Sequence, residues 1–95
     1  MTNAEIAQVF FNIAELLKLK KENIFKIRAY EKAAQAIEEL PLDVDKLAAE
    51  GRLREIPGVG EAINKKIMEL VTTGKLNFYE RLKAEFPESP VQEKR

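Results

Sequence analysis

The chain has 95 residues, and its 16 Lys and Arg balance its 16 Asp and Glu, so the formal net charge is zero. This length suits one small domain, and the charge balance argues against a protein that coats nucleic acid non-specifically. Cysteine and histidine are both absent, which excludes disulfides, zinc clusters and thiol or imidazole catalysis, so a metal would need oxygen ligands.

An apolar stripe at helical spacing opens the chain and predicts a first helix, with Thr2 or Asn3 as its N-cap. The stripe consists of Ile6, Val9, Phe10, Ile13, Leu16 and Leu17. A second helix is expected to begin after Asn23 and to run to about Glu39, because Pro41 prevents its continuation. No apolar run approaches the roughly 18 residues that span a bilayer. We therefore expect a soluble, cytoplasmic protein without membrane contact.

A short helix follows, with Asp43 as its cap, and a longer helix is expected over about residues 60–73. The last helix begins at Asn77 and ends before residues 87–95, whose prolines and charges predict a flexible tail. The predicted fold class is therefore all-α, a small bundle of about four main helices plus one short helix.

A proline–glycine turn directly precedes the 60–73 helix, in the order Pro57, Gly58, Val59, Gly60. Proline suits the first central position of a type II turn, and Gly58 can take the positive φ that the second position needs. Gly60 has no Cβ to keep a ligand away, and Val59 is expected to anchor the turn in the core. Amides at a helix start lack intrahelical partners and carry the positive end of the dipole, so this turn predicts a phosphate site. An ordinary turn between two helices is the alternative.

Two lysines lie close to apolar helix faces. On a wheel of the second helix, Lys26 falls near the middle of the expected buried arc and Tyr30 lies one turn along. The arc consists of Phe25, Ala29, Ala33, Ala36, Ile37 and Leu40. Lys66 lies at the edge of the next apolar stripe, whereas Lys65 points outward. A snorkelling Lys26, a core role for Tyr30 and a solvated Lys66 are the alternatives to a functional site.

The charges are unevenly distributed although they sum to zero. Residues 18–32 hold six basic residues against two acids, whereas residues 38–50 hold five acids against one lysine. The basic segment suits a polyanionic partner, and a solvated helix face is the alternative for residues 18–21.

Three spaced segments carry a resemblance to a known family. Residues 54–67 (REIPGVGEAINKKI) resemble the hairpin of a helix-hairpin-helix DNA-binding motif. With FKIRAYEKAA at 25–34 and TGKL at 73–76, residues 1–86 resemble the amino-terminal domain of family X DNA polymerases, of the bacterial and archaeal type. Its eukaryotic counterpart is the small lyase domain of DNA polymerase beta. The predicted domain is thus 1–86, with the hairpin at about 54–74.

The resemblance implies sequence-independent, structure-specific binding of gapped or nicked DNA at a 5′-phosphate end, in base-excision repair and in the nucleoid. The residues expected to contact DNA are Lys26, Tyr30, Lys32, Arg54, Gly58, Val59, Gly60, Lys65 and Lys75. Lys66 falls on the family's Schiff-base lysine, which implies the nucleophile of a 5′-deoxyribose-phosphate lyase. Such a lysine attacks an aldehyde only when unprotonated, and Lys26, Arg54 and Lys65 would lower its pKa by repulsion.

Three positions depart from the polymerase beta type. Ala62 replaces a phosphate-binding lysine, Phe25 replaces a histidine that packs against a template base, and Phe78 replaces another basic residue. These losses weaken the phosphate pocket and the lowering of the pKa of Lys66, so whether the chain is an enzyme stays open.

No second hairpin, paired aspartates or polymerase palm follows the domain, so we expect no polymerisation by this chain alone. The sequence therefore predicts a fragment of a longer polymerase, whose remaining domains would be its partners. A natural tail at 87–95 is the alternative.

The resemblance also implies Na⁺ or K⁺ at the hairpin, held by the backbone carbonyls of Arg54, Ile56 and Val59, with no other cofactor required. The competing class of function is a protein-interaction domain without DNA chemistry, which the zero net charge and the acidic residues 38–50 would suit. The two classes differ in salt dependence, because phosphate binding weakens steeply with salt and an apolar interface changes little.

Overall fold

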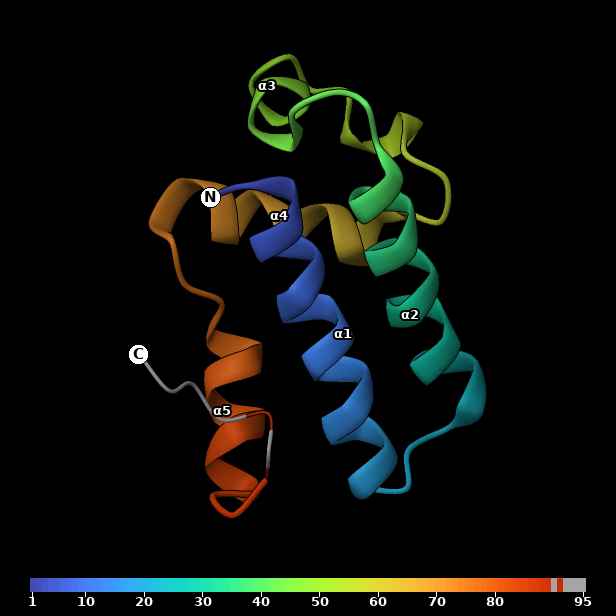
Figure 1. Cartoon of the computed structure of the whole chain (residues 1–95), viewed down its shortest axis with the longest axis vertical. Helices are drawn as coiled ribbons and strands as arrows, with labels where there is room; N and C mark the ends of the chain where they lie inside the picture. The colour runs from blue at the N-terminus through green and yellow to red at the C-terminus, as the bar shows by residue number, and fades with distance from the viewer. Residues whose placement is uncertain (90, 92–95) are drawn as a thin grey trace.

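The computed structural model describes residues 1–89 and 91, and all regular structure in that part of the chain is helical (Figure 1). The elements are α1 (Asn3–Leu19), α2 (Ile24–Glu39), α3 (Val44–Ala49), the 3₁₀ turn η1 (Leu53–Glu55), α4 (Glu61–Thr73) and α5 (Asn77–Glu85). The four longer helices and the short α3 confirm the predicted all-α bundle. Over the described ranges, no helix combines the length and the apolarity needed to cross a bilayer.

The fold is built around α1, which pairs with α2 in antiparallel fashion along most of its length (Figure 1). α4 crosses this pair at one end, and α5 lies along the other side of α1. α3 and η1 follow the end of α2 and lead the chain back into α4. The turn between η1 and α4 therefore lies next to α2.

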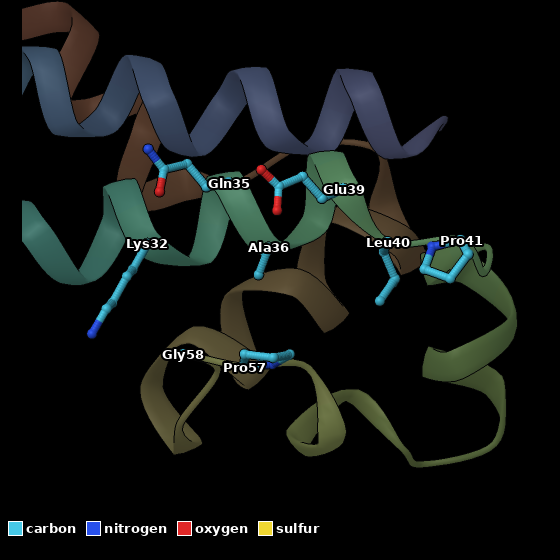
Figure 2. A pocket seen from close by; sticks show the side chains of 8 residues that line it. All are labelled: Lys32, Gln35, Ala36, Glu39, Leu40, Pro41, Pro57 and Gly58. Atoms are coloured by element: carbon cyan, nitrogen blue, oxygen red, sulfur yellow. The ribbon is translucent and has the colours of Figure 1, made fainter.

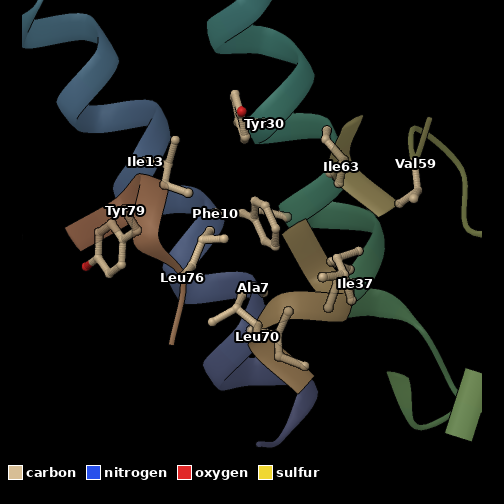
Figure 3. Packing of buried hydrophobic residues seen from close by; sticks show 14 of the residues in the cluster. Ala7, Phe10, Ile13, Tyr30, Ile37, Val59, Ile63, Leu70, Leu76 and Tyr79 are labelled. Carbon is tan, nitrogen blue, oxygen red and sulfur yellow. The ribbon is translucent and has the colours of Figure 1, made fainter. Parts of the chain in front are cut away.

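Phe10 of α1 is fully buried at the point where α1, α2 and α4 meet (Figure 3). Its ring stacks on that of Tyr30 in α2, with centroids 6.0 Å apart. Ile37 of α2 and Ile63 of α4 are also buried in this cluster. Full burial of such a side chain contributes about 1.5–3 kcal/mol to the free energy of unfolding. The core therefore fixes α4, and with it the preceding turn, against the α1–α2 pair.

The helix starts are held by side chains, only some of which the sequence predicts. Thr2, one of the two residues predicted as the N-cap of α1, takes that role and forms a capping box with Glu5. Asp43 is the N-cap residue of α3, but its side chain makes no capping hydrogen bond, so that part of the prediction is wrong. Asn3 takes this role instead. Its Oδ1 accepts a 2.9 Å hydrogen bond from the amide of Val44, and its Nδ2 donates one of 2.7 Å to the carbonyl of Leu42.

α2 is rotated relative to the predicted wheel. It buries Ile27, Tyr30, Ala33, Ala34 and Ile37. Phe25 is 74% exposed and Ala29 is exposed, so both were wrongly assigned to the buried arc. Alanines occur on both faces of α2 and leave the phase ambiguous, and contact with α1 selects the face that carries Ile27 and Tyr30. The side chain of Lys26 consequently lies outside the buried arc and is half exposed.

The segment after α5 turns back on the bundle. Phe86 and Val91 are partly buried against the core, and the hydroxyl of Tyr79 donates a 3.5 Å hydrogen bond to the carbonyl of Val91. The predicted flexible tail 87–95 includes residues 90 and 92–95, which lie outside the described residues. The domain limits stay predictions.

Candidate phosphate-binding site

The turn before α4 has the predicted type II geometry. Gly58 adopts a φ of +84°, and the amide of Val59 donates a 3.1 Å hydrogen bond to the carbonyl of Ile56. Ile56 and Val59 are both buried, whereas Pro57 and Gly58 are exposed. The turn is therefore anchored by its two ends while its tip faces solvent. Val59 contributes this anchoring, and its amide is already engaged within the turn.

One side of this exposed tip lies beside α2. A Cβ added to Gly58 would stand 3.7 Å from both the Cβ of Lys32 and the amide nitrogen of Ala33. A groove of about 470 Å³ continues from this contact along α2, and Figure 2 shows Ala36 and Leu40 pointing across it toward the turn. Gly58 is thus required by its positive φ, whereas an added Cβ would make only ordinary van der Waals contact with α2.

α4 begins at Gly60, which is its N-cap residue with φ −94° and ψ −167° and supplies no side-chain cap. The amides of Glu61, Ala62 and Ile63 belong to the first turn, where an α-helix offers no carbonyl partner. These amides also carry the positive end of the dipole of a 13-residue helix. A Cβ on Gly60 would meet no atom within 4 Å, so packing does not demand glycine here. The start of α4 is therefore open to an anionic oxygen.

The cations around the turn fall into two groups. Lys65 lies 3.7 Å from the carboxylate of Glu61, in a pair whose side chains are both about three-quarters exposed. Arg54 and Lys32 are exposed, and among the described residues neither has a carboxylate within ion-pair distance. Arg28, one turn before Lys32 on α2, is also exposed and makes no ion pair with any described residue. Arg28 is not among the site residues predicted from the sequence, although its i, i+4 spacing from Lys32 indicates a shared face.

Lys66 is partly buried, a feature that it shares only with Lys83 among the described lysines. Its Nζ lies 4.9 Å from the centre of the Phe78 ring. Burial lowers the pKa of Lys66, the nearby charge of Lys26 lowers it further, and Glu69 partly opposes both effects. Arg54 and Lys65 were also expected to lower the pKa of Lys66, but they do not contribute to the shift. Lys26 is the cation that lowers it. The Phe78 ring attracts the ammonium form and works against the lowered pKa.

Tyr30 is a core residue rather than a surface contact. It is 6% exposed, and its ring stacks between Phe10 at 6.0 Å and Phe78 at 6.1 Å. Burial raises the pKa of its phenol. Its ring therefore supports the Phe78 ring, on which the Lys66 ammonium lies, and the alternative of an amphipathic core residue is confirmed for Tyr30.

The structure does not bring Lys75 to the hairpin. α4 is 13 residues long and rises about 1.5 Å per residue, so Lys75, which follows its C-terminal end, lies about 20 Å from the turn that precedes it. Lys75 instead lines a groove between α1 and α5. We therefore set it apart from the candidate site.

Of the carbonyls predicted to hold a monovalent cation, those of Arg54 and Ile56 lie on the chain entering the hairpin turn and that of Val59 lies where the chain leaves it. The carbonyl of Ile56 accepts the amide of Val59, and within residues 1–89 and 91 no amide donates to the carbonyls of Arg54 or Val59. Acidic side chains offer no alternative, since the described residues contain no group of three Asp or Glu placed to hold a metal. Hard monovalent cations accept oxygen ligands of this kind.

A model of a protein family described as a helix-hairpin-helix domain matches residues 1–76. The chain belongs to this family. The helix-hairpin-helix domain is also 32% identical over 91 residues, or 96% of the chain, to the DNA polymerase/3'-5' exonuclease PolX of Bacillus subtilis. It is 29% identical over 83 residues, or 87% of the chain, to DNA polymerase lambda of Arabidopsis thaliana. These relatives confirm the resemblance to the family X polymerase domain.

The helix-hairpin-helix domain spans 15% of the length of both curated relatives. The similarity therefore concerns one domain of each polymerase. It covers the hairpin of residues 54–74 together with α1 and α2, which are the elements that position it.

Proposed function

We propose that this helix-hairpin-helix domain binds DNA through the phosphates of one strand. The observation that carries the proposal is the uncapped start of α4 beside the exposed tip of the hairpin turn. Lys32 lies beside Gly58 and Arg54 belongs to η1, and neither cation has an ion pair among the described residues. Amides and cations suit phosphate oxygens, and phosphate contacts carry no base information, so binding would depend on DNA structure and not on sequence. The two relatives are named DNA polymerases, which supports the same partner.

We further propose that the preferred DNA is gapped or nicked and carries a 5′-phosphate. A terminal phosphate has more negative charge than an internal one, and Lys26, half exposed and close enough to Lys66 to perturb it, would add to Arg54 in binding that charge. The context would be repair synthesis in base-excision repair, alongside the remaining domains of a family X polymerase. The protein would then act in the cytoplasm at the nucleoid.

The test compares a one-nucleotide gap bearing a 5′-phosphate with the same DNA bearing a 5′-hydroxyl, by fluorescence anisotropy. The wild type should prefer the phosphate, and Lys26→Ala should remove most of that preference. Lys20→Ala is the matched control, because Lys20 pairs with Glu85 at the far end of the bundle. Equal affinities of the wild type for the two DNA ends would contradict the 5′-phosphate site.

A second candidate function, 5′-deoxyribose-phosphate lyase activity, is favoured by the partial burial of Lys66 next to Lys26. The neutral Nζ would add to C1′ of the ring-opened sugar and release water, which gives a Schiff base. Loss of the C2′ proton to solvent and cleavage of the C3′–O bond would free the strand with its 5′-phosphate. Water would then return the lysine and the unsaturated aldehyde.

Borohydride reduction tests the lyase proposal, since it fixes a Schiff base as a covalent adduct. Incubation with an incised 5′-deoxyribose-phosphate substrate should give an adduct that Lys66→Ala abolishes and Lys65→Ala largely spares. An adduct yield unchanged by Lys66→Ala, or no adduct with the wild type, would refute the assignment. Either result would leave the DNA-binding proposal intact, because the lyase step needs more than binding.

We also propose that Na⁺ or K⁺ bridges the hairpin and a DNA phosphate through the carbonyls of Arg54, Ile56 and Val59. The cation would supply charge neutralisation between carbonyl and phosphate oxygens. At constant ionic strength, DNA affinity should be higher in NaCl or KCl than in tetramethylammonium chloride, whose cation is too large for the site. Equal affinity in all three salts would exclude the cation.

A further inference from the structure

A second groove opens beside the hairpin, between the outer face of α2 and the turn. It runs from Phe25 in the first turn of α2 past Arg28 and Glu31 to Lys32, and Gly58 forms its far wall. Arg28 and Lys32 are one helical turn apart and therefore lie on the same face of α2. Because Gly58 is also the tip of the hairpin turn, the groove is continuous with the candidate phosphate site.

The charge of this groove is set by a contact from another helix. Glu31 is the acid that lines it, and its carboxylate lies 3.0 Å from the Nζ of Lys18 on α1. Lys18 also lies 3.1 Å from Glu15, and these two acids raise the pKa of Lys18. Arg28 and Lys32 make no ion pair with any described residue. The groove therefore presents two cations without ion pairs beside an acid whose charge is partly offset by Lys18, which Glu31 shares with Glu15.

We propose that this groove is a second phosphate subsite, in which Arg28 and Lys32 bind a backbone phosphate next to the one held at the start of α4. Lys18 acts as a positioning residue, since its pairing with Glu31 removes a repulsive carboxylate from the subsite. The inference rests on the proposed function, because it assigns the groove to the same DNA strand. Arg28 is the principal contact, since a guanidinium can donate two parallel hydrogen bonds to a phosphate.

The first experiment measures DNA affinity of Arg28→Gln as a function of salt. Loss of one phosphate contact should weaken binding about three- to tenfold at low salt and reduce the slope of log K against log [salt] by about 1. Arg81→Gln is the matched control, since Arg81 is an exposed arginine of α5 without an ion pair among the described residues. Identical slopes for the two variants would overturn the subsite.

The second experiment isolates the role of Lys18. Lys18→Gln and Lys20→Gln remove the same charge from the same end of α1, but only the first frees Glu31 beside the groove. Lys18→Gln should weaken DNA binding more than Lys20→Gln, and the double variant with Glu31→Gln should recover the loss. Equal losses, or no recovery by Glu31→Gln, would overturn the positioning role.

A variant at the start of α4 separates failure of this inference from failure of the proposed function. If Gly60→Asp abolishes DNA binding while Arg28→Gln behaves as Arg81→Gln, only the second subsite is overturned. If Gly60→Asp binds DNA as tightly as the wild type, the assignment of a phosphate to the start of α4 is refuted; if the wild type itself does not bind DNA, the proposed function and the subsite fall together.

Discussion

Replacement of Gly60 by aspartate should change stability and DNA affinity in opposite directions. Gly60 already has the extended backbone of an N-cap residue, and a Cβ there would meet no atom within 4 Å. An aspartate carboxylate at this position can accept hydrogen bonds from the amides of Ala62 or Ile63. Those amides are also the ones assigned to the DNA phosphate. The new side chain would therefore stabilise the helix and occupy the binding site.

The magnitudes follow from the cap and from the lost phosphate contact. Aspartate in place of glycine at an N-cap, with its charge at the positive end of α4, adds about 0.5–1 kcal/mol to the free energy of unfolding. For a domain of this size that corresponds to a rise in Tm of about 2–8 °C. Loss of a charge-assisted hydrogen bond costs about 1.5–3 kcal/mol of binding, or about 10- to 150-fold in Kd.

Thermal unfolding, followed by circular dichroism, measures the change in stability. Fluorescence anisotropy at fixed salt measures the change in DNA affinity. Ala4→Asp is the control, because it adds the same charge to the first turn of another helix, α1. Ala4 lines a groove together with Gly74, which lies at the end of α4 opposite to Gly60, so the added charge is far from the hairpin. Gly60→Asn separates amide occupancy from charge, since asparagine caps without adding a negative charge. A Gly60→Asp protein that keeps wild-type DNA affinity while its Tm rises would refute the assignment of these amides to a phosphate.

Four further outcomes are expected. In an NMR titration, the Nζ of Lys66 should lose its proton at a lower pH than an ordinary lysine does, and Lys26→Gln should raise the pKa of Lys66; an unchanged value would contradict the coupling. Because the folded-state pKa of Lys66 is lowered, the unfolded state binds more protons, so the contribution of Lys66 to stability should rise with pH through its folded pKa. Tyr30→Ala should lower the free energy of unfolding by about 3–5 kcal/mol while Tyr30→Phe changes it little, as urea denaturation can measure. Asn3→Ala should lower the free energy of unfolding by about 1–3 kcal/mol, because it removes two hydrogen bonds to the start of α3. A loss no larger than that of Ala4→Gly would contradict this role of Asn3.

The sequence predicts the hairpin well because its geometry is local. Proline and glycine restrict their own backbone angles, so the order Pro57, Gly58 is sufficient for the turn with φ of +84° at Gly58. Val59 is also buried as expected, because the glycines on either side of it have no side chain and only Val59 can anchor this part of the turn in the core. Such features depend on three or four adjacent residues and on no distant contact.

The features that the sequence did not predict depend on contacts between distant segments. The phase of α2 was misassigned at Phe25 because alanines give little contrast between helix faces, and only the fit against α1 decides it. Asn3 caps α3 across 41 positions of sequence, which no local pattern reveals. The Lys18–Glu31 pair likewise joins two helices, so the charge of the groove could not be read from the basic segment alone.

The salt dependence of affinity for gapped DNA bearing a 5′-phosphate tests the central claim most directly. Arg28, Lys32 and Arg54 surround the hairpin without ion pairs to any described residue, and each neutralised phosphate contributes about −0.7 to −0.9 to the slope of log K against log [salt]. We predict a slope of about −2 to −3 for the wild type. A slope near zero would contradict phosphate binding by the hairpin and favour a protein-interaction domain.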